Sequence, residues 1–201
     1  NTVARRIEKY YRKPVDAVIF PPVEIPEQTS FQKEDFALVV SRLSPYKKID
    51  QAILACQKAG IKLKVAGTGS DEGRLKSIAS NSVEFLGRIS DKQKWELMQR
   101  ARLFLFPGID DFGITPVEAI ACNTPVIAFN QGGATETVIN QKNGILYQPQ
   151  TVKALAQAIR EAIDNHTQFK SNHFRQHAKQ FSEQNFISKF KKLINDSLPK
   201  I

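Results

Sequence analysis

Short apolar runs recur through the middle of the chain, and amphipathic segments separate them. The runs are rich in branched residues and end in polar or glycine-containing loops, a pattern typical of strands buried on both faces. From Phe36 onward they are FALVVS, KLKVAG, VEFLG, LFLFP and TPVIAF, with GILY as a sixth candidate. Apolar residues at helical spacing predict intervening helices over 50–59, 72–80, 92–102 and 115–122, and longer helices over 152–165 and 182–196.

This alternation of strands and helices predicts a Rossmann-like α/β fold, in which a mostly parallel sheet is flanked by helices on both faces. Ligands bound to such sheets lie in the crevice beyond the carboxyl ends of the strands. The loops that follow the strands are therefore where we expect candidate site residues.

The two ends of the chain depart from this pattern. A basic helix, RRIEKYYRK, is expected to end at Pro14, and the proline-rich AVIFPPVEIPE is typical of an extended connector. We therefore expect three parts. They are a connector helix and linker over 1–35, a Rossmann-like domain over 36–180 and a closing helix over 181–201.

Composition narrows the class of protein. The chain has 201 residues, of which 41% are hydrophobic and 24% charged, as in a globular protein and unlike a disordered one. The sequence has no apolar run of about 18 residues and no secretory signal pattern, so we expect a soluble, cytoplasmic protein. Cys56 and Cys122 lie in apolar helical patterns, which predicts reduced, buried thiols rather than a disulfide.

The formal net charge of +9 is concentrated at the ends of the chain. Residues 1–20 hold five basic and two acidic residues, and residues 161–201 hold seven and four. Such an excess favours an anionic partner, either nucleic acid, anionic lipid or a phosphorylated ligand, although a solvated surface explains it equally well. Because the basic residues are not interleaved with aromatic ones, we do not expect nucleic-acid binding.

Two basic side chains follow the first predicted strand. Arg42 comes just after the strand, and Lys47 lies near the start of the next helix. A guanidinium and an ammonium group there could clamp a diphosphate, with help from the amino end of the helix. The alternative is a pair of solvated loop cations.

Small residues follow the second strand in VAGTGSDEG, beginning at Gly67. This is not a dinucleotide-binding fingerprint, because it follows the second strand, has the wrong spacing and lacks the acidic residue about 20 positions later. The glycines would still permit a ligand to approach the backbone closely.

The loop after the fourth strand and the helix that follows it hold several candidate ligand-binding groups. Backbone amides from Gly113 to Thr115, at the start of the next helix, suit a phosphate group. Asp110 and Glu118 lie eight positions apart, and both could accept hydrogen bonds from sugar hydroxyls. The alternative makes Asp110 and Asp111 helix-capping acids and Glu118 a first-turn charge that complements the helix dipole.

No metal site is expected. Two adjacent acids, Asp110 and Asp111, make poor geometry for a divalent cation without further convergent ligands. His173 and His177 are four positions apart in a predicted helix, but Phe174 stands where a metalloprotease motif needs Glu. We interpret these histidines as a surface pair.

Five motifs together resemble the nucleotide-sugar-binding half of a family-four retaining glycosyltransferase, of the mannosyltransferase-like kind. In order they are SRLSPYKK, VAGTGSDEGRLK, FLGRIS, DDFGITPVEAIACNTPVIAF and GGATETV, and the similarity covers about residues 36–165. The resemblance implies the C-terminal half of a GT-B fold, in which two Rossmann-like halves face each other. Residues 1–35 would then be the connector from a missing N-terminal acceptor domain, and 181–201 the helix that crosses back.

The resemblance also implies roles for individual residues. Arg42 and Lys47, with Lys48 as a close rival, would bind the donor diphosphate, and Asp110 would contact the donor sugar. The first acid in this family is usually Glu, one methylene longer than Asp110. The remaining donor-binding candidates are Gly67, Arg88, Ile89, Gly113, Ile114, Thr115 and Glu118, of which Glu118 would hold the ribose and 88–89 would lie near the base.

The function implied is transfer of a sugar, with mannose from GDP-mannose expected, to a lipid-linked or saccharide acceptor in polysaccharide biosynthesis. The resemblance implies retention of anomeric configuration and no metal or other cofactor. The acceptor would bind through the missing N-terminal domain, and the basic ends could contact anionic lipid at the inner face of the membrane. The alternatives are a non-catalytic nucleotide-sugar-binding module and a phosphorylase or epimerase of the same two-half architecture.

Overall fold

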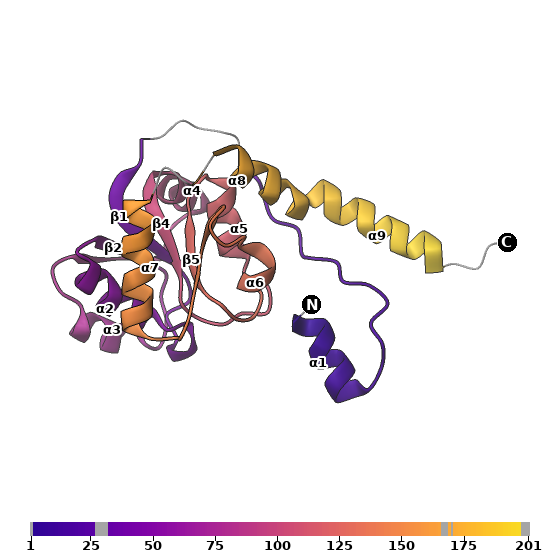
Figure 1. The fold of residues 1–201 in the computed structure, drawn as a ribbon, viewed down its shortest axis with the longest axis horizontal. Coiled ribbons are helices and arrows are strands. Elements are labelled where there is room, and N and C mark those ends of the chain that lie inside the picture. The colour runs from indigo at the N-terminus through magenta and orange to yellow at the C-terminus, as the bar shows by residue number, and fades with distance from the viewer. Residues whose placement is uncertain (1, 27–31, 166–168, 170, 198–201) are drawn as a thin grey trace.

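The computed structural model describes residues 2–26, 32–165, 169 and 171–197. Within them, six strands form one sheet with the order β3-β2-β1-β4-β5-β6, and every neighbouring pair is parallel (Figure 1). The strands are β1 (Glu34–Val40), β2 (Lys62–Ala66), β3 (Val83–Gly87), β4 (Ala101–Phe106), β5 (Val126–Phe129) and β6 (Gly144–Tyr147). The predicted Rossmann-like parallel sheet is confirmed, with the sixth candidate strand included.

Nine helices are described, and those packed on the sheet cover both of its faces. They are α1 (Thr2–Tyr11), α2 (Ile49–Ala59), α3 (Glu72–Ile78), α4 (Asp91–Arg100), α5 (Ile114–Ala121), α6 (Ala134–Thr137), α7 (Val152–Asp164), α8 (Ser171–Ala178) and α9 (Glu183–Ser197). Short 3₁₀ turns, η1 (Pro45–Lys47) and η3 (Lys179–Phe181), precede α2 and α9. Each expected helix is present, within a few residues of its predicted ends.

Strand β1 shows why the sheet divides the protein into two cores. Successive side chains of a strand point to opposite faces. Ala37 and Val39 accordingly join a core with α2, α3 and α7, whereas Phe36 and Leu38 join a second core with α4, α5 and α8. All four are nearly inaccessible to solvent, which explains the uninterrupted apolar run in the sequence.

The carboxyl end of α4 differs from the prediction for a non-local reason. The helix expected to reach Arg102 ends at Arg100, and strand β4 begins at once with Ala101. Ala101 and Leu103 are buried and pair with β1 at Glu34 and Ala37. Pairing in the sheet therefore places Ala101 and Arg102 in β4, against their expected place at the end of the helix.

Both cysteines are free and buried, as expected. Burial raises the pKa of the Cys56 and Cys122 thiols to about 12, since the charged thiolate is disfavoured away from water. Neither thiol is therefore suited to nucleophilic chemistry.

Helices α1 and α9 differ from the others, because within the described residues neither contains a buried side chain. Both lie beside the sheet domain rather than on it, and α9 extends away from it (Figure 1). An aromatic cluster of Phe20, Phe112 and Phe181 joins the N-terminal segment and η3 to the body. The division of the chain at residues 35 and 180 stays a prediction.

Candidate functional site

The order of the strands locates the candidate site. Strands β1 and β4 lie side by side in the middle of the sheet, and the chain proceeds outward from them in opposite directions. This is a topological switch point, where the loops after the two strands leave a crevice. A cleft of about 430 Å³ lies there, and its lining includes six predicted site residues: Arg42, Lys47, Asp110, Gly113, Ile114 and Thr115.

Glycines allow the loops around the cleft to pack against one another. A Cβ atom at Gly67 would lie 1.9 Å from the Ser41 carbonyl oxygen, and one at Gly69 would lie 2.1 Å from that of Leu43. The Ser41 amide donates to the carbonyl oxygen of Ala66, the last residue of β2, and the Leu43 amide donates to that of Thr68 in the following loop. Gly67 thus allows close approach of the chain itself.

The loop after β4 is packed in the same way. A Cβ atom at Gly108 would lie 2.9 Å from the Lys47 Cα, and one at Gly133 would lie 2.3 Å from the Phe112 Cα. The Gly133 amide also donates to the Asp110 carbonyl oxygen at 2.8 Å. The loops after β1, β4 and β5 therefore form one packed rim around the cleft.

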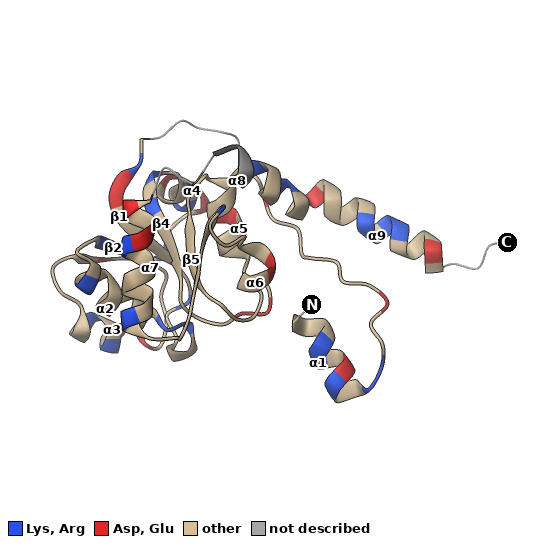
Figure 2. Ribbon diagram, viewed as in Figure 1, with Lys and Arg blue, Asp and Glu red and all other residues tan. Residues whose placement is uncertain are grey.

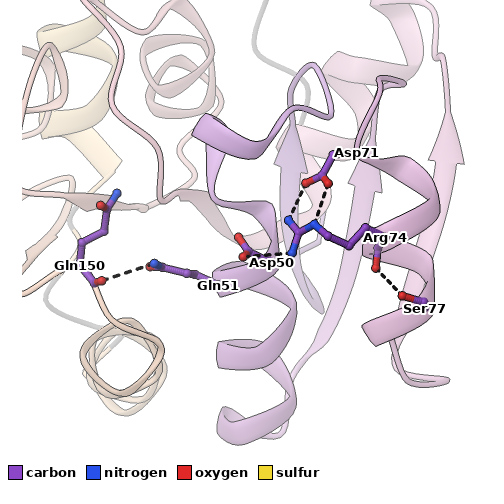
Figure 3. A network of polar contacts seen from close by, with 6 residues as sticks. All are labelled: Asp50, Gln51, Asp71, Arg74, Ser77 and Gln150. Atoms are coloured by element: carbon purple, nitrogen blue, oxygen red, sulfur yellow. Dashed lines mark hydrogen bonds and ion pairs between the residues drawn. The ribbon is translucent and has the colours of Figure 1, made fainter.

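Hydrogen bonds around Arg74 join the two helices that flank β2, α2 and α3 (Figure 3). The Arg74 guanidinium donates to both carboxylate oxygens of Asp71, at 2.7 and 2.6 Å, and reaches Asp50 at 3.4 Å. The hydrogen bond from Arg74 holds the pKa of Asp71 below its usual value. Helix α3 is thereby tied to the amino end of α2, directly after the loop that carries Arg42.

Lys47 and Asp110 form an ion pair in the cleft. The Lys47 Nζ lies 2.7 Å from Oδ1 and 2.6 Å from Oδ2 of Asp110, and 15% and 22% of the two side chains are exposed. Lys48, the rival candidate, adopts φ 55° at the start of α2 and is not among the residues that line the cleft. The structure therefore favours Lys47 over Lys48 as the cleft lysine.

Arg42 is exposed at the same cleft. Among the described residues, its guanidinium has no hydrogen-bond or ion-pair partner, in contrast to the Lys47 ammonium group. An unpaired guanidinium beside a cleft presents several N–H donors to an incoming anion.

Helix α5 directs its amino end at the cleft. Gly113 precedes the helix with φ 85°, and no side chain in the described part of the chain caps it. Asp110 instead pairs with Lys47, and Asp111 pairs with Arg6 at 2.7 Å. The helix-capping alternative for these two acids is therefore wrong, and the first amides of α5 remain available to an anion.

Glu118 lies deeper, in the second turn of α5. Its side chain is 8% exposed, and its Oε1 accepts a hydrogen bond from Lys94 Nζ of α4 at 2.7 Å. The first turn of α5 contains no acidic residue, so the interpretation of Glu118 as a first-turn charge is wrong. Glu118 faces α4, and the structure does not bring its carboxylate to the wall of the cleft that Asp110 lines.

The remaining candidates lie apart from the cleft. Arg88 is exposed in the loop before α4, and Ile89 lines a separate hollow of about 300 Å³ with Leu86, Gln93 and Leu97. The donor-binding roles of these two residues and of Gly67 stay predictions.

Sequence reasoning missed several residues of the site. Tyr46, Phe106 and Phe112 line the cleft, and Phe112 could have been found from its place beside Asp110. Lys94 had no local signal, since it lies 24 positions before Glu118 on another helix.

His177 is not a freely exposed side chain, contrary to its predicted place in a surface pair. His177 is half-buried, and its Nε2 lies 2.8 Å from the Thr137 carbonyl oxygen. Burial lowers the pKa of His177, although the contact with Thr137 opposes the shift. The side chain of His173 lies outside the described residues. No group of three or more His, Cys, Asp or Glu in the described part of the chain could hold a metal ion.

Comparison with known proteins identifies a family that most of the chain matches. Residues 22–181 match the family described as glycosyl transferases group 1. The chain is 43% identical over 86 residues to the alpha-1,3/1,6-mannosyltransferase ALG2 of Dictyostelium discoideum, which covers 42% of this chain and 20% of that protein. It is 31% identical over 139 residues to the glycogen synthase of Mycobacterium tuberculosis, covering 64% of this chain and 34% of that protein. The chain thus spans between a fifth and about a third of these two relatives.

Solved structures share the fold. A mutant of S. aureus TarM, in complex with UDP and other ligands, superposes with a TM-score of 0.81 at 21% identity, covering 96% of this chain and 42% of that one. Anabaena Alr3699/HepE in complex with UDP and glucose gives a TM-score of 0.70 at 26% identity, covering 82% and 49%. The expected architecture, one half of a GT-B fold, is confirmed.

Proposed function

The chain belongs to the glycosyl transferases group 1, and on that premise we propose that it is the donor-binding half of a retaining glycosyltransferase. The observation that carries this proposal is that Arg42, Lys47 and the amino end of α5 face one cleft at the switch point of the sheet. Three sources of positive charge thus surround a space where a nucleotide diphosphate fits.

The donor diphosphate binds between Arg42 and the first amides of α5 in this proposal. The Arg42 guanidinium takes one phosphate through paired hydrogen bonds, and the amides from Gly113 to Thr115 take the other. As the bond to the sugar breaks, negative charge accumulates on the leaving diphosphate. These fixed donors then stabilise the transition state more than the ground state, without a metal.

Lys47 and Asp110 link the diphosphate to the sugar. The Lys47 ammonium group is shared between the terminal phosphate and Asp110, and the freed carboxylate oxygen accepts a sugar hydroxyl. The short Asp side chain suits this role, because Lys47 already reaches both of its oxygens. The ion pair is therefore the resting state of a site whose charges rearrange when the donor arrives.

We propose mannose as the sugar and GDP-mannose as its donor, with a lipid-linked or saccharide acceptor in polysaccharide biosynthesis. The similarity to ALG2 mannosyltransferases supports this choice. UDP-sugars are the alternative donors, because TarM and HepE were both solved with UDP. Transfer requires the acceptor-binding half, which excludes water and aligns the nucleophile.

Contact with anionic lipid and a cytoplasmic location are part of the proposal. Lys and Arg lie along α1 and α9 and outnumber the acidic residues of these helices (Figure 2). Apolar side chains of α9, including Ile187, Phe190 and Ile194, are also exposed. Within the described residues, no helix combines the length and apolarity needed to cross a bilayer.

Isothermal titration calorimetry of the 201-residue chain with GDP-mannose, UDP-glucose and UDP-N-acetylglucosamine tests the proposal. We expect one of the three to bind with a stoichiometry of one, and the same chain to transfer no sugar to lipid or saccharide acceptors. Absence of binding by all three would contradict a donor site. Transfer at an ordinary enzymatic rate would contradict the half-enzyme assignment.

A further inference from the structure

A second cavity lies at the opposite end of the sheet from the candidate donor cleft. It has a volume of about 370 Å³ and is lined by residues at the amino ends of β1 and β4, whereas the cleft lies at their carboxyl ends. Part of its wall is apolar and is formed by Leu103, Pro125, Ala162 and Phe174. A volume of this size lies within the range of small-molecule sites, roughly 300–1,000 Å³.

Two acids of β1 that line this cavity already have arginine partners. Glu34 accepts a hydrogen bond from Arg100 at 3.0 Å, and Asp35 accepts one from Arg102 at 2.6 Å. The charges of these acids are therefore balanced by β4 and by the end of α4.

The Lys33 amine, at the same cavity, has only neutral partners among the described residues. Its Nζ donates to Thr124 Oγ1 at 2.5 Å and reaches the Cys122 carbonyl oxygen at 3.5 Å. The Thr124 hydroxyl itself donates to the Met98 carbonyl oxygen, so its own oxygen is left to accept from the lysine. No carboxylate in the described part of the chain contacts this amine, and a positive charge on it is unbalanced.

The surroundings of the amine disfavour that charge. Part of the Lys33 residue is exposed, but burial of its amine lowers the pKa to about 8, and an opposing influence of Cys122 is smaller. The Cys122 thiol is itself neutral at this pH, because burial raises its pKa to about 12. An anion that enters the cavity would balance the ammonium group through a charge-assisted hydrogen bond.

An acceptor without a donor lies in the wall of the same cavity. The Oδ1 atom of Asn123 is buried and has no hydrogen-bond partner among the described residues. A buried acceptor that lacks a donor destabilises the protein, and a ligand O–H group would remove that penalty. The cavity thus combines an unbalanced cation, an unsatisfied acceptor and an apolar wall.

We propose that this cavity binds a small organic carboxylate that has an apolar body and a hydroxyl group. The carboxylate pairs with Lys33, and the hydroxyl donates to Asn123 Oδ1. The apolar body packs against Leu103, Pro125 and Phe174. One unbalanced cation matches a single carboxylate better than a phosphate group, which carries up to two negative charges. The site lies at the far end of the strands from the donor cleft, so it stands or falls independently of the proposed function.

The test uses three small aromatic probes in NMR titrations of the 201-residue chain. They are para-hydroxyphenylacetate, its neutral amide and phenylacetate, which lacks the hydroxyl. At pH 7 we expect the amide to bind about tenfold more weakly than the hydroxylated acid, because the charge-assisted contact is lost. Between pH 7 and pH 9 the acid should lose about fivefold in affinity and the amide should change little, because Lys33 becomes neutral over this range.

Variants of Lys33 assign the effect to its amine. Lys33→Met should bind acid and amide equally at both pH values. Lys33→Arg keeps its charge at pH 9 and should prefer the acid at both pH values alike. Lys62→Met, which removes an exposed lysine at the amino end of the neighbouring strand β2, should match the wild type.

The Asn123 contact has a separate test. Asn123 has φ 55°, a conformation that glycine adopts readily, so Asn123→Gly removes the side chain without straining the backbone. The wild type should bind para-hydroxyphenylacetate several-fold more tightly than phenylacetate, and this variant should bind the two acids equally.

Three outcomes would overturn the proposal. They are no binding of either acid to the wild type, equal binding of acid and amide at pH 7, and a folded Lys33→Met chain that keeps the preference for the acid. Equal binding of the two acids by the wild type would contradict the contact with Asn123. The comparison of acid with amide needs no variant, so it decides the matter even if a substitution prevents folding.

Discussion

Two lysine–carboxylate pairs involve residues in or just before α5, and they differ in geometry and in the burial of the acid. Lys47 and Asp110 come from loops after β1 and β4, and the lysine contacts both carboxylate oxygens. Lys94 and Glu118 come from two helices, and one carboxylate oxygen is engaged. The exposed fraction of the acidic side chain falls from 22% in the first pair to 8% in the second, whereas the two lysines are similar at 15% and 17%.

The difference in burial between the two pairs indicates that one can rearrange and the other is held in place. A pair in an open cleft is weakened by water and can be exchanged when a ligand brings its own charges. A pair buried between helices is fixed before the ligand arrives, because separating it would leave a charge without solvent. We therefore interpret the loop pair as the part that rearranges around the diphosphate, and the helix pair as the part that is preorganised.

Loss of one partner should affect stability very differently in the two pairs, and this is the largest expected effect. Lys94→Met leaves the Glu118 carboxylate, whose side chain is 8% exposed, without its cation and should lower the free energy of unfolding by about 3 kcal/mol. Lys47→Met leaves Asp110, whose side chain is 22% exposed at the open cleft, and should cost about 1 kcal/mol. Urea denaturation followed by circular dichroism measures both. Equal losses in the two variants would remove the basis of the comparison.

Asp110→Asn tests whether the Lys47–Asp110 pair rearranges when a nucleotide binds. The substitution removes a negative charge from the cleft and frees Lys47, so a nucleoside diphosphate without sugar should bind a few-fold more tightly, within about 1 kcal/mol. The complete nucleotide sugar should gain less, because the carboxylate that accepts the sugar hydroxyl is lost. Calorimetry with both ligands checks the difference. Weaker binding of the free diphosphate would show that Asp110 does not compete for Lys47.

The smallest expected effect is a loss, at alkaline pH, of the stability that the Lys94–Glu118 pair gives to the fold. A lysine whose pKa is raised by folding stabilises the fold below its unfolded pKa, near 10.4, and that contribution is lost as the pH rises through the folded value. The stability difference between wild type and Lys94→Met should therefore be constant from about pH 8 to about pH 9.5 and shrink above about pH 10.4. Denaturation at these pH values tests it, with Lys92→Met, which removes an exposed lysine of the same helix, as control. A difference that grows with pH would contradict the assignment.

The fold was largely predictable because its signals are local. Buried parallel strands need apolar runs, and VEFLG marks β3 with its observed bounds, Val83–Gly87. The helix expected to reach Arg102 failed for a non-local reason, because Ala101 pairs with β1 across the sheet.

The site was predictable only where a charged side chain or a helix start comes soon after a strand in the sequence. Arg42, Lys47, Asp110 and the start of α5 could be expected at one crevice, because the ends of parallel strands meet at one edge. The lysines that pair with these acids could not be predicted, because Lys47 lies 63 positions before Asp110 and Lys94 lies 24 positions before Glu118. Gly67 shows the same limit, because its neighbour is the Ser41 carbonyl of another loop.

The central claim is that the cleft between β1 and β4 binds the diphosphate of a nucleotide sugar, with Arg42 as its unpaired cation. Calorimetric affinities of wild type and Arg42→Ala for the nucleoside diphosphate and the bare nucleoside test it most directly. The account predicts at least a tenfold loss for the diphosphate, from a charge-assisted contact of about 1.5–3 kcal/mol, and little change for the nucleoside. Lys58→Ala, which removes an exposed charge at the far end of α2, should leave both affinities unchanged. Equal weakening of both ligands by Arg42→Ala, or no weakening of either, would contradict the claim.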